Sequence, residues 1–206
     1  LLLLPTVVLN GAFWGQCDSI YAALCIHALA CALDRKPGAS VVLLAAAFSF
    51  KLQAIFLLPL WCVFWFTGRM KARHIPLFPL TYFLFLLPAL LLGKPLGDAL
   101  GVYFGQAAEY SQYLTLNAPS VYALIPYGVQ VNTGTASRLG ILAAFALVAV
   151  LLLLLFRFRR QVDREILFTA AVLLAVGVPW LLPNMHDRYF FLADALTLLW
   201  ACLSPR

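Results

Sequence analysis

Apolar runs bounded by charged residues, proline or glycine divide most of the chain into segments of helical length. Each run is expected to form a helix: Leu1–Leu9, Ser19–Leu33, Ala39–Phe50, Ala54–Phe66, Ile75–Leu92, Leu139–Phe156, Ile166–Leu182 and Phe190–Leu203. A helix that crosses the hydrocarbon core needs about 20 residues, so the shorter runs must be tilted, buried between neighbours or continued past their polar ends. The pattern predicts an all-α, polytopic transmembrane bundle of seven to eight helical segments, several of them shorter than a full span.

The composition excludes a soluble globular domain, a disordered chain and a fibrous repeat. Hydrophobic residues make up 64% of the 206 residues, charged residues make up 11%, and the mean hydropathy is +0.95. Soluble domains are about 45–50% apolar and about 25% charged, so residues 1–206 are expected to form a single transmembrane domain. Because the chain opens on Leu1 without a basic leader, we expect a fragment whose N-terminal spans and first outside loop precede Leu1.

The basic residues are distributed unevenly between the two ends of the expected spans. Ten of the 14 fall within three loops or at the C-terminus, in Asp34–Gly38, Thr67–His74 and Arg157–Glu165 and at Arg206. Basic residues collect in cytoplasmic loops, so these loops are expected in the cytoplasm, and alternation places segments 93–138 and 183–189 outside. The net charge of +6 then has a topological cause and does not indicate a nucleic-acid partner.

No familiar catalytic or metal-binding pattern is present in the sequence. The five cysteines form no C-x-x-C pair and lie mostly in apolar runs, so they indicate neither a disulfide framework nor a zinc site. A Gly-rich phosphate loop, a Ser-His-Asp constellation and a spaced set of metal ligands are all missing. No cofactor is therefore predicted, and the need for a divalent metal is left open.

The first of three polar clusters is Trp14-Gly15-Gln16-Cys17-Asp18. Trp14 suits a membrane interface, and Asp18 could cap the helix that follows by accepting hydrogen bonds from its first N–H groups. Helix capping does not require Gln16, however, and the string is unusual for a linker. A binding role for this cluster therefore stands beside the capping interpretation.

The second cluster places Lys51 and Gln53 inside a long apolar stretch, residues 39–66. An unpaired charge in hydrocarbon costs several kcal/mol, so a lysine at this place indicates a functional site with a partner group. Alternatively, Lys51 extends to the outer interface at a helix junction, where its ammonium group reaches water.

The third cluster runs from Asn184 to Tyr189 and lies between two apolar segments. Asn184 followed three residues later by Asp187 resembles a capping box, but such a box does not explain His186 and Arg188. Together these side chains and a helix N-terminus could bind an anion. Asp194 would share a helical stripe with Asp187, where it could pair with a basic neighbour.

The long segment 93–138 contains several tyrosines, among them Tyr103 and Tyr122. A connection of this length is usually functional or contains helices of its own. Tyrosine suits both sugar binding and a membrane interface, so this segment is a weak indication of function.

Taken in order, the three clusters resemble motifs of the GT-C superfamily of membrane glycosyltransferases. The matching residues are Trp14-Gly15-Gln16-x-Asp18, Phe50-Lys51-x-Gln53-Ala54 and Met185-His186-Asp187-Arg188-Tyr189. The pattern is most similar to bacterial membrane proteins related to the GPI-anchor mannosyltransferases. In that pattern, proline usually stands at Leu52 and glutamate at Asp187. Leu52 is expected to keep the helix more continuous, and Asp187 has a shorter reach.

The resemblance implies an inverting hexosyl- or mannosyltransferase of the bacterial inner membrane, with its active face outside the cytoplasm. Its donor would be a polyprenyl-phosphate sugar, and its acceptor a lipid-linked, glycan or protein hydroxyl. Arg188 and His186 would bind the phosphate with help from Lys51, while Gln16, Gln53 and Asp18 would hold hydroxyl groups. The expected substrate-binding set is completed by Trp14, Asp187 and Tyr189. Asp18 is the candidate catalytic carboxylate, although the main base of such enzymes is expected before Leu1.

Two other classes remain open from the sequence. A secondary transporter also has short helices and an intramembrane lysine, but no internal repeat is found, and the polar residues collect at one face. A non-catalytic membrane subunit is the third possibility, because material before Leu1 is expected.

Overall fold

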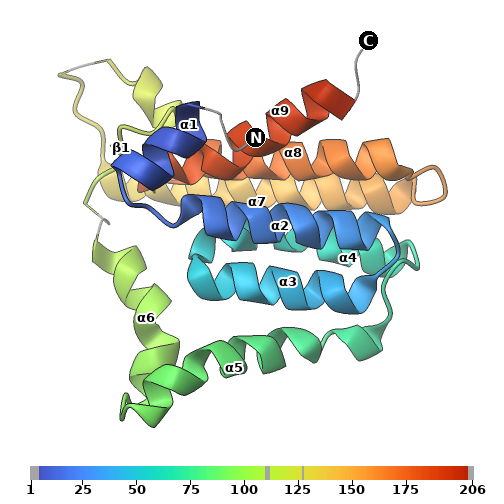
Figure 1. Cartoon of the computed structure of the whole chain (residues 1–206). Coiled ribbons are helices and arrows are strands. Elements are labelled where there is room, and N and C mark those ends of the chain that lie inside the picture. The colour runs from blue at the N-terminus through green and yellow to red at the C-terminus, as the bar shows by residue number, and fades with distance from the viewer. Residues whose placement is uncertain (1–4, 110–111, 127, 204–206) are drawn as a thin grey trace.

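The computed structural model describes residues 5–109, 112–126 and 128–203, and these residues are predominantly helical (Figure 1). The α-helices are α1 (Pro5–Val8), α2 (Asp18–Leu33), α3 (Pro37–Phe50), α4 (Leu58–Phe66), α5 (Leu77–Leu91), α6 (Leu96–Glu109), α7 (Thr133–Arg157), α8 (Arg164–Leu181) and α9 (Phe191–Leu203). The shorter helices are η1 (Leu9–Phe13), η2 (Leu52–Leu57), η3 (Ala72–His74), η4 (Val121–Leu124) and η5 (Asp187–Phe190), of which η1 is a π-helix and the others are 3₁₀-helices. Two strands of two residues each, β1 (Thr115–Leu116) and β2 (Met185–His186), pair in parallel.

The described part of each predicted apolar run is mainly helical, so the all-α prediction is confirmed. Residues 1–4 of the first run lie outside the described part of the chain. Three helical stretches are long and apolar enough to cross a membrane, namely Ala72–Leu91, Thr133–Arg157 and Arg164–Leu181. The segment 93–138 contains a helix of its own, α6, which runs across the direction of α5 at one end of the bundle (Figure 1).

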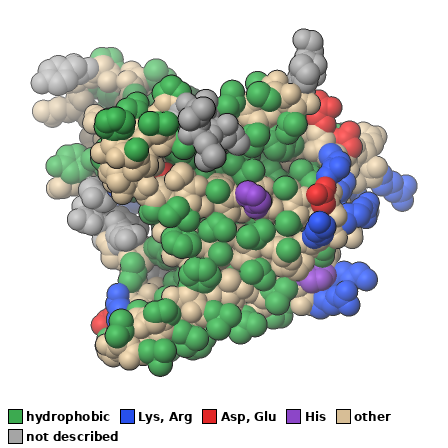
Figure 2. Space-filling model, in the orientation of Figure 1, with side chains coloured by type: hydrophobic (Ala, Val, Ile, Leu, Met, Phe, Trp, Pro, Cys, Tyr) green, Lys and Arg blue, Asp and Glu red, His purple; other side chains and the backbone are tan. Residues whose placement is uncertain are grey.

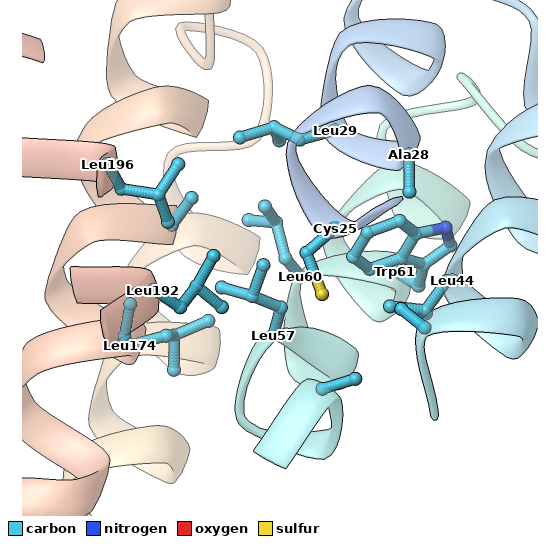
Figure 3. Packing of buried hydrophobic residues seen from close by; sticks show 14 of the residues in the cluster. Cys25, Ala28, Leu29, Leu44, Leu57, Leu60, Trp61, Leu174, Leu192 and Leu196 are labelled. Carbon is cyan, nitrogen blue, oxygen red and sulfur yellow. The ribbon is translucent and has the colours of Figure 1, made fainter. Parts of the chain in front are cut away.

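The core lies between α2, α3, α4, α8 and α9. Leucines from several helices point into it, among them Leu57 and Leu60, which face Leu174, Leu192 and Leu196 (Figure 3). Buried alanines on α2 and α3 allow these two helices to pack closely, as small residues do between membrane helices.

Ser40 links three of these helices by hydrogen bonds inside the apolar core. Its hydroxyl group donates to the carbonyl oxygen of Ala28 on α2 at 2.8 Å, and it accepts from the indole nitrogen of Trp61 on α4 at 3.1 Å. Because a buried hydroxyl without partners is costly, both bonds favour this one arrangement of α2, α3 and α4.

The three basic loops meet at one end of the bundle. Arg164, the first residue of α8, pairs with Asp34 after α2, and a guanidinium nitrogen of Arg69 donates to the carbonyl oxygen of Leu33 at 3.5 Å. Burial, followed by the nearby positive charges of Arg35 and Arg164, lowers the pKa of Arg69. Lysine and arginine side chains collect at this end, and much of the face seen beside them is hydrophobic (Figure 2). The loops therefore share an end as expected, and its assignment to the cytoplasm stays a prediction.

Gly140 marks a close contact between α7, α8 and η4. The Tyr122 hydroxyl group donates to the carbonyl oxygens of Leu181, at 3.1 Å, and Ala136, at 3.3 Å. A Cβ atom added at Gly140 would lie 1.7 Å from this hydroxyl oxygen and 2.6 Å from the Leu181 carbonyl oxygen. Only glycine fits here without displacing the backbone.

Gly140→Ala is therefore expected to destabilise the protein by about 1–3 kcal/mol, the usual range for overpacking. Thermal unfolding of the purified protein in lipid nanodiscs measures the change. Gly97→Ala on α6 is the control, because a Cβ atom there meets nothing within 4 Å. Equal unfolding temperatures for the two variants would contradict the close contact.

Candidate functional site

Asp18 is at the centre of a buried polar network at the end of the bundle opposite the basic loops. It is the first residue of α2, and none of its surface is exposed. One carboxylate oxygen accepts from the side-chain nitrogen of Asn10 at 2.8 Å, and the other pairs with the ammonium group of Lys51. The helix N-cap is Cys17, which makes no side-chain cap. The capping interpretation of Asp18 is therefore wrong, because both of its oxygens bind side chains.

Lys51 lies at a break between α3 and η2. Its φ of −151° and ψ of 132° are extended, and the 3₁₀-helix η2 begins at Leu52. The expectation that Leu52 keeps the helix continuous is therefore wrong. The break leaves the last carbonyl groups of α3 without helical donors. The Tyr103 hydroxyl group on α6 donates to one of them, the carbonyl oxygen of Phe48, at 2.5 Å.

The Lys51 side chain turns into the protein instead of reaching the interface alone. It is 15% exposed, its ammonium group pairs with Asp18, and it lies 5.7 Å from the centre of the Tyr21 ring. A charge taken out of water needs such a partner. The alternative in which Lys51 only extends to water is therefore wrong, and the expectation of a specific partner is confirmed.

The third cluster is held by the pairing of β2 with β1, which lies within the segment 93–138. Met185 and His186 pair with Thr115 and Leu116. Asn184 has a φ of +61°, and its backbone nitrogen donates to the carbonyl oxygen of Leu114 at 2.9 Å. These contacts fix the start of the 185–189 segment against a distant part of the chain.

Within this segment, Asp187 orients its neighbours. One carboxylate oxygen lies 2.5 Å from Nδ1 of His186 and accepts from the backbone nitrogen of Arg188 at 2.7 Å. The N-cap position of η5 is taken by His186, so the capping box that starts at Asn184 is wrong. The described residues provide no ion pair for Asp194, which lies on the exposed side of α9.

Arg188 joins the third cluster to the first. One terminal guanidinium nitrogen donates to the side-chain oxygen of Gln16 at 2.8 Å, across 172 positions of sequence. The guanidinium carbon lies 5.9 Å from the centre of the Tyr189 ring. Since Gln16 lies two residues before Asp18, the first residue of α2, the three clusters form one connected site.

A cleft of about 440 Å³ opens beside this network. One wall is polar and contains Lys51, Gln53, Arg188 and Tyr189, all of them predicted site residues. The remaining lining is largely aromatic and apolar: Ser49, Phe50, Leu52, Tyr82, Phe85, Leu86, Ala99, Val102 and Tyr103. The volume falls within the range of about 300–1,000 Å³ that is usual for small-molecule sites.

The other predicted site residues do not line the cleft. Gln16 and Asp18 bind Arg188 and Lys51, respectively, and these two basic residues line the cleft. His186 and Asp187 directly precede Arg188 in the chain. The Trp14 side chain is 53% exposed and lies outside it. Sequence reasoning missed Tyr82, although it and Thr81 are the only polar side chains in α5.

Two side-chain atoms that are buried at the cleft lack a hydrogen-bond partner within the described residues. They are the amide oxygen of Gln53, an acceptor, and Nε of Arg188, a donor. Among the described residues, no group of three or more His, Cys, Asp or Glu side chains could hold a metal ion.

Comparison of the chain with protein-family models, with curated proteins and with solved structures finds no match.

Proposed function

We propose that this chain forms the donor-binding part of an integral membrane glycosyltransferase that uses a polyprenyl-phosphate sugar. One observation carries the proposal: residues of the second and third motifs line one cleft at the end opposite the basic loops, and residues of the first motif bond to Lys51 and, across 172 positions, to Arg188. The resemblance of the same three motifs to the GT-C superfamily supports it. The transferred group is a hexose, of the mannosyl type in the related enzymes.

The cleft offers fixed positive charge where a phosphate leaving group gains negative charge. In the proposed reaction, an acceptor hydroxyl oxygen bonds to the anomeric carbon, and the bond from that carbon to the phosphate oxygen breaks. The electron pair leaves with polyprenyl phosphate, and a carboxylate takes the acceptor proton. Arg188 and Lys51 stabilise the departing phosphate, because preorganised cations act most strongly on charge that develops in the transition state.

Asp18 holds Lys51 in place in this proposal and does not act as the base. Both of its oxygens have partners, and it is absent from the cleft lining. The base that deprotonates the acceptor is therefore proposed to come from another part of the protein. His186 lies beside Asp187 and approaches the phosphate from the same segment as Arg188.

The deciding experiment is transfer of labelled hexose by the full-length protein in nanodiscs. Polyprenyl phosphates that carry mannose, glucose or galactose serve as donors, and a membrane extract supplies acceptors. We expect transfer from at least one donor, with release of polyprenyl phosphate. If a folded, monodisperse protein neither transfers sugar nor releases polyprenyl phosphate with any of the donors, the proposal is overturned.

The active face is proposed to lie outside the cytoplasm, because the cleft and the basic loops occupy opposite ends of the bundle. Gln130→Cys and Gln161→Cys, each in a variant that lacks the five native cysteines, test this. Both glutamines are exposed. An impermeant thiol reagent added to spheroplasts is expected to label position 130 only. Labelling of both positions from the same side would refute the topology.

A further inference from the structure

An apolar groove of about 340 Å³ lies between α3, α4 and the start of α5. Its lining consists of apolar side chains: Val41, Leu44, Leu58, Trp61, Cys62, Trp65, Met70, Ile75, Phe78 and Pro79. None of these residues lines the cleft of the candidate site. The groove is open at the protein surface, where Trp65 is 55% exposed and Ile75 is 50% exposed. The proposed reaction makes no use of it.

The basic end of the bundle borders this groove. Met70 belongs to the loop 67–74, and Ile75 directly follows that loop. The loop contains no acidic residue, and its lysine and arginines are Arg69, Lys71 and Arg73. Helix α3, which provides Val41, begins without a side-chain cap, so the positive end of its dipole adds to this charge. Positive charge therefore stands at one end of an apolar groove.

Arginines from three loops lie close together at this end, beside the hydrophobic face of the bundle (Figure 2). Burial, followed by the positive charges of Arg35 and Arg164, lowers the pKa of Arg69. Of the carboxylates nearby, that of Asp34 is already paired with Arg164, and that of Asp163 caps α8. Like charges at short distance repel each other, so an added anion would stabilise this end of the protein.

Trp65 adds a hydrogen-bond donor to the apolar lining. Its indole nitrogen has no hydrogen bond to any described residue, whereas that of Trp61 donates to the hydroxyl oxygen of Ser40 at 3.1 Å. Exposed tryptophan is typical of the boundary between hydrocarbon and headgroups, because its ring is apolar and its N–H reaches polar groups. Trp65 precedes the loop 67–74 by two residues. Apolar lining, donor and positive charge thus match the acyl chain, ester and phosphate of a phospholipid.

We infer that this groove binds an anionic phospholipid of the membrane, with an acyl chain along the apolar lining and the phosphate among the basic residues of the loop 67–74. Basic pockets between membrane helices bind lipid headgroups by the same attraction. A zwitterionic phospholipid carries an ammonium group that the loop repels, and a free phosphate leaves the apolar lining uncovered. The inference is independent of the proposed reaction, because groove and cleft share no residue.

Fluorescence quenching by brominated phospholipids tests this inference without any turnover. In the full-length protein, every tryptophan except Trp61 and Trp65 is replaced by phenylalanine. Nanodiscs of phosphatidylcholine then receive equal fractions of phosphatidylglycerol or phosphatidylcholine with brominated acyl chains. At low ionic strength, we expect phosphatidylglycerol to bind about fivefold more tightly, the effect of about one basic residue at a membrane surface. Lys71→Gln/Arg73→Gln, at two exposed positions, is expected to remove most of this preference.

The matched control is Arg157→Gln/Arg160→Gln, which removes the same charge from exposed positions in a loop that does not line the groove. Its preference for phosphatidylglycerol is expected to persist. A protein that retains only Trp200, which is exposed on α9 and outside the groove, is expected to show no preference. Glycerol 1-phosphate, the headgroup phosphate without chains, should not displace the lipid. Equal quenching by both lipids, equal loss in both double variants, or displacement by glycerol 1-phosphate would overturn the inference.

Discussion

Replacing Arg188 by alanine is expected to lower sugar transfer by about 30- to 1000-fold, which corresponds to about 2–4 kcal/mol of transition-state stabilisation. The guanidinium group lines the cleft and is oriented by Gln16, with 2.8 Å between the bonded atoms. Arginine presents a planar fork that can hold two phosphate oxygens, whereas lysine presents a flexible point charge. Arg188→Lys is therefore expected to recover only part of the rate.

The measurement is transfer per folded molecule, with thermal unfolding recorded for every variant. Arg159→Ala is the control, because Arg159 is exposed at the basic end of the bundle. Gln16→Leu is expected to lower the rate less than Arg188→Ala, since it removes the orientation of the charge and leaves the charge itself. If Arg188→Ala lowers only the unfolding temperature, the segment merely starts a helix, and its proposed role in phosphate binding is wrong.

The helices could be predicted from the sequence because their cause is local. Apolar runs with polar or Pro/Gly boundaries mark helices in lipid, where every backbone polar group must be paired within the segment. The α3 boundary at Phe50 was predicted in this way. Helix α6 was not among the predicted runs, because glycines and polar residues interrupt its apolar pattern.

The candidate site could be predicted as a set of residues, but its contacts could not. From the sequence, capping could also explain Asp18, because the choice between a helix terminus and Lys51 depends on packing across 33 positions. Tyr82 was missed for a related reason. A single tyrosine in an apolar run carries no signal until α6 closes against α5 and the cleft exists.

The Asp18–Lys51 pair leads to the second large effect, which concerns stability. The Asp18 side chain is 1% exposed and that of Lys51 is 15% exposed. Removal of one partner of a buried pair leaves an uncompensated charge, which typically costs about 3–5 kcal/mol. Asp18→Leu and Lys51→Met are each expected to lower the unfolding free energy by an amount in this range, and Asn10 alone does not neutralise the charge that Lys51→Met leaves behind.

The double variant Asp18→Leu/Lys51→Met separates the two roles of Lys51. It contains neither charge, so it is expected to regain most of the stability that either single variant loses. It should remain inactive, because Lys51 lines the cleft and the proposed phosphate contact is gone. Denaturant unfolding in nanodiscs, measured beside the transfer assay, gives both quantities. A double variant as unstable as the sum of the single variants would show that the two charges do not stabilise each other, and normal transfer in it would remove Lys51 from the site.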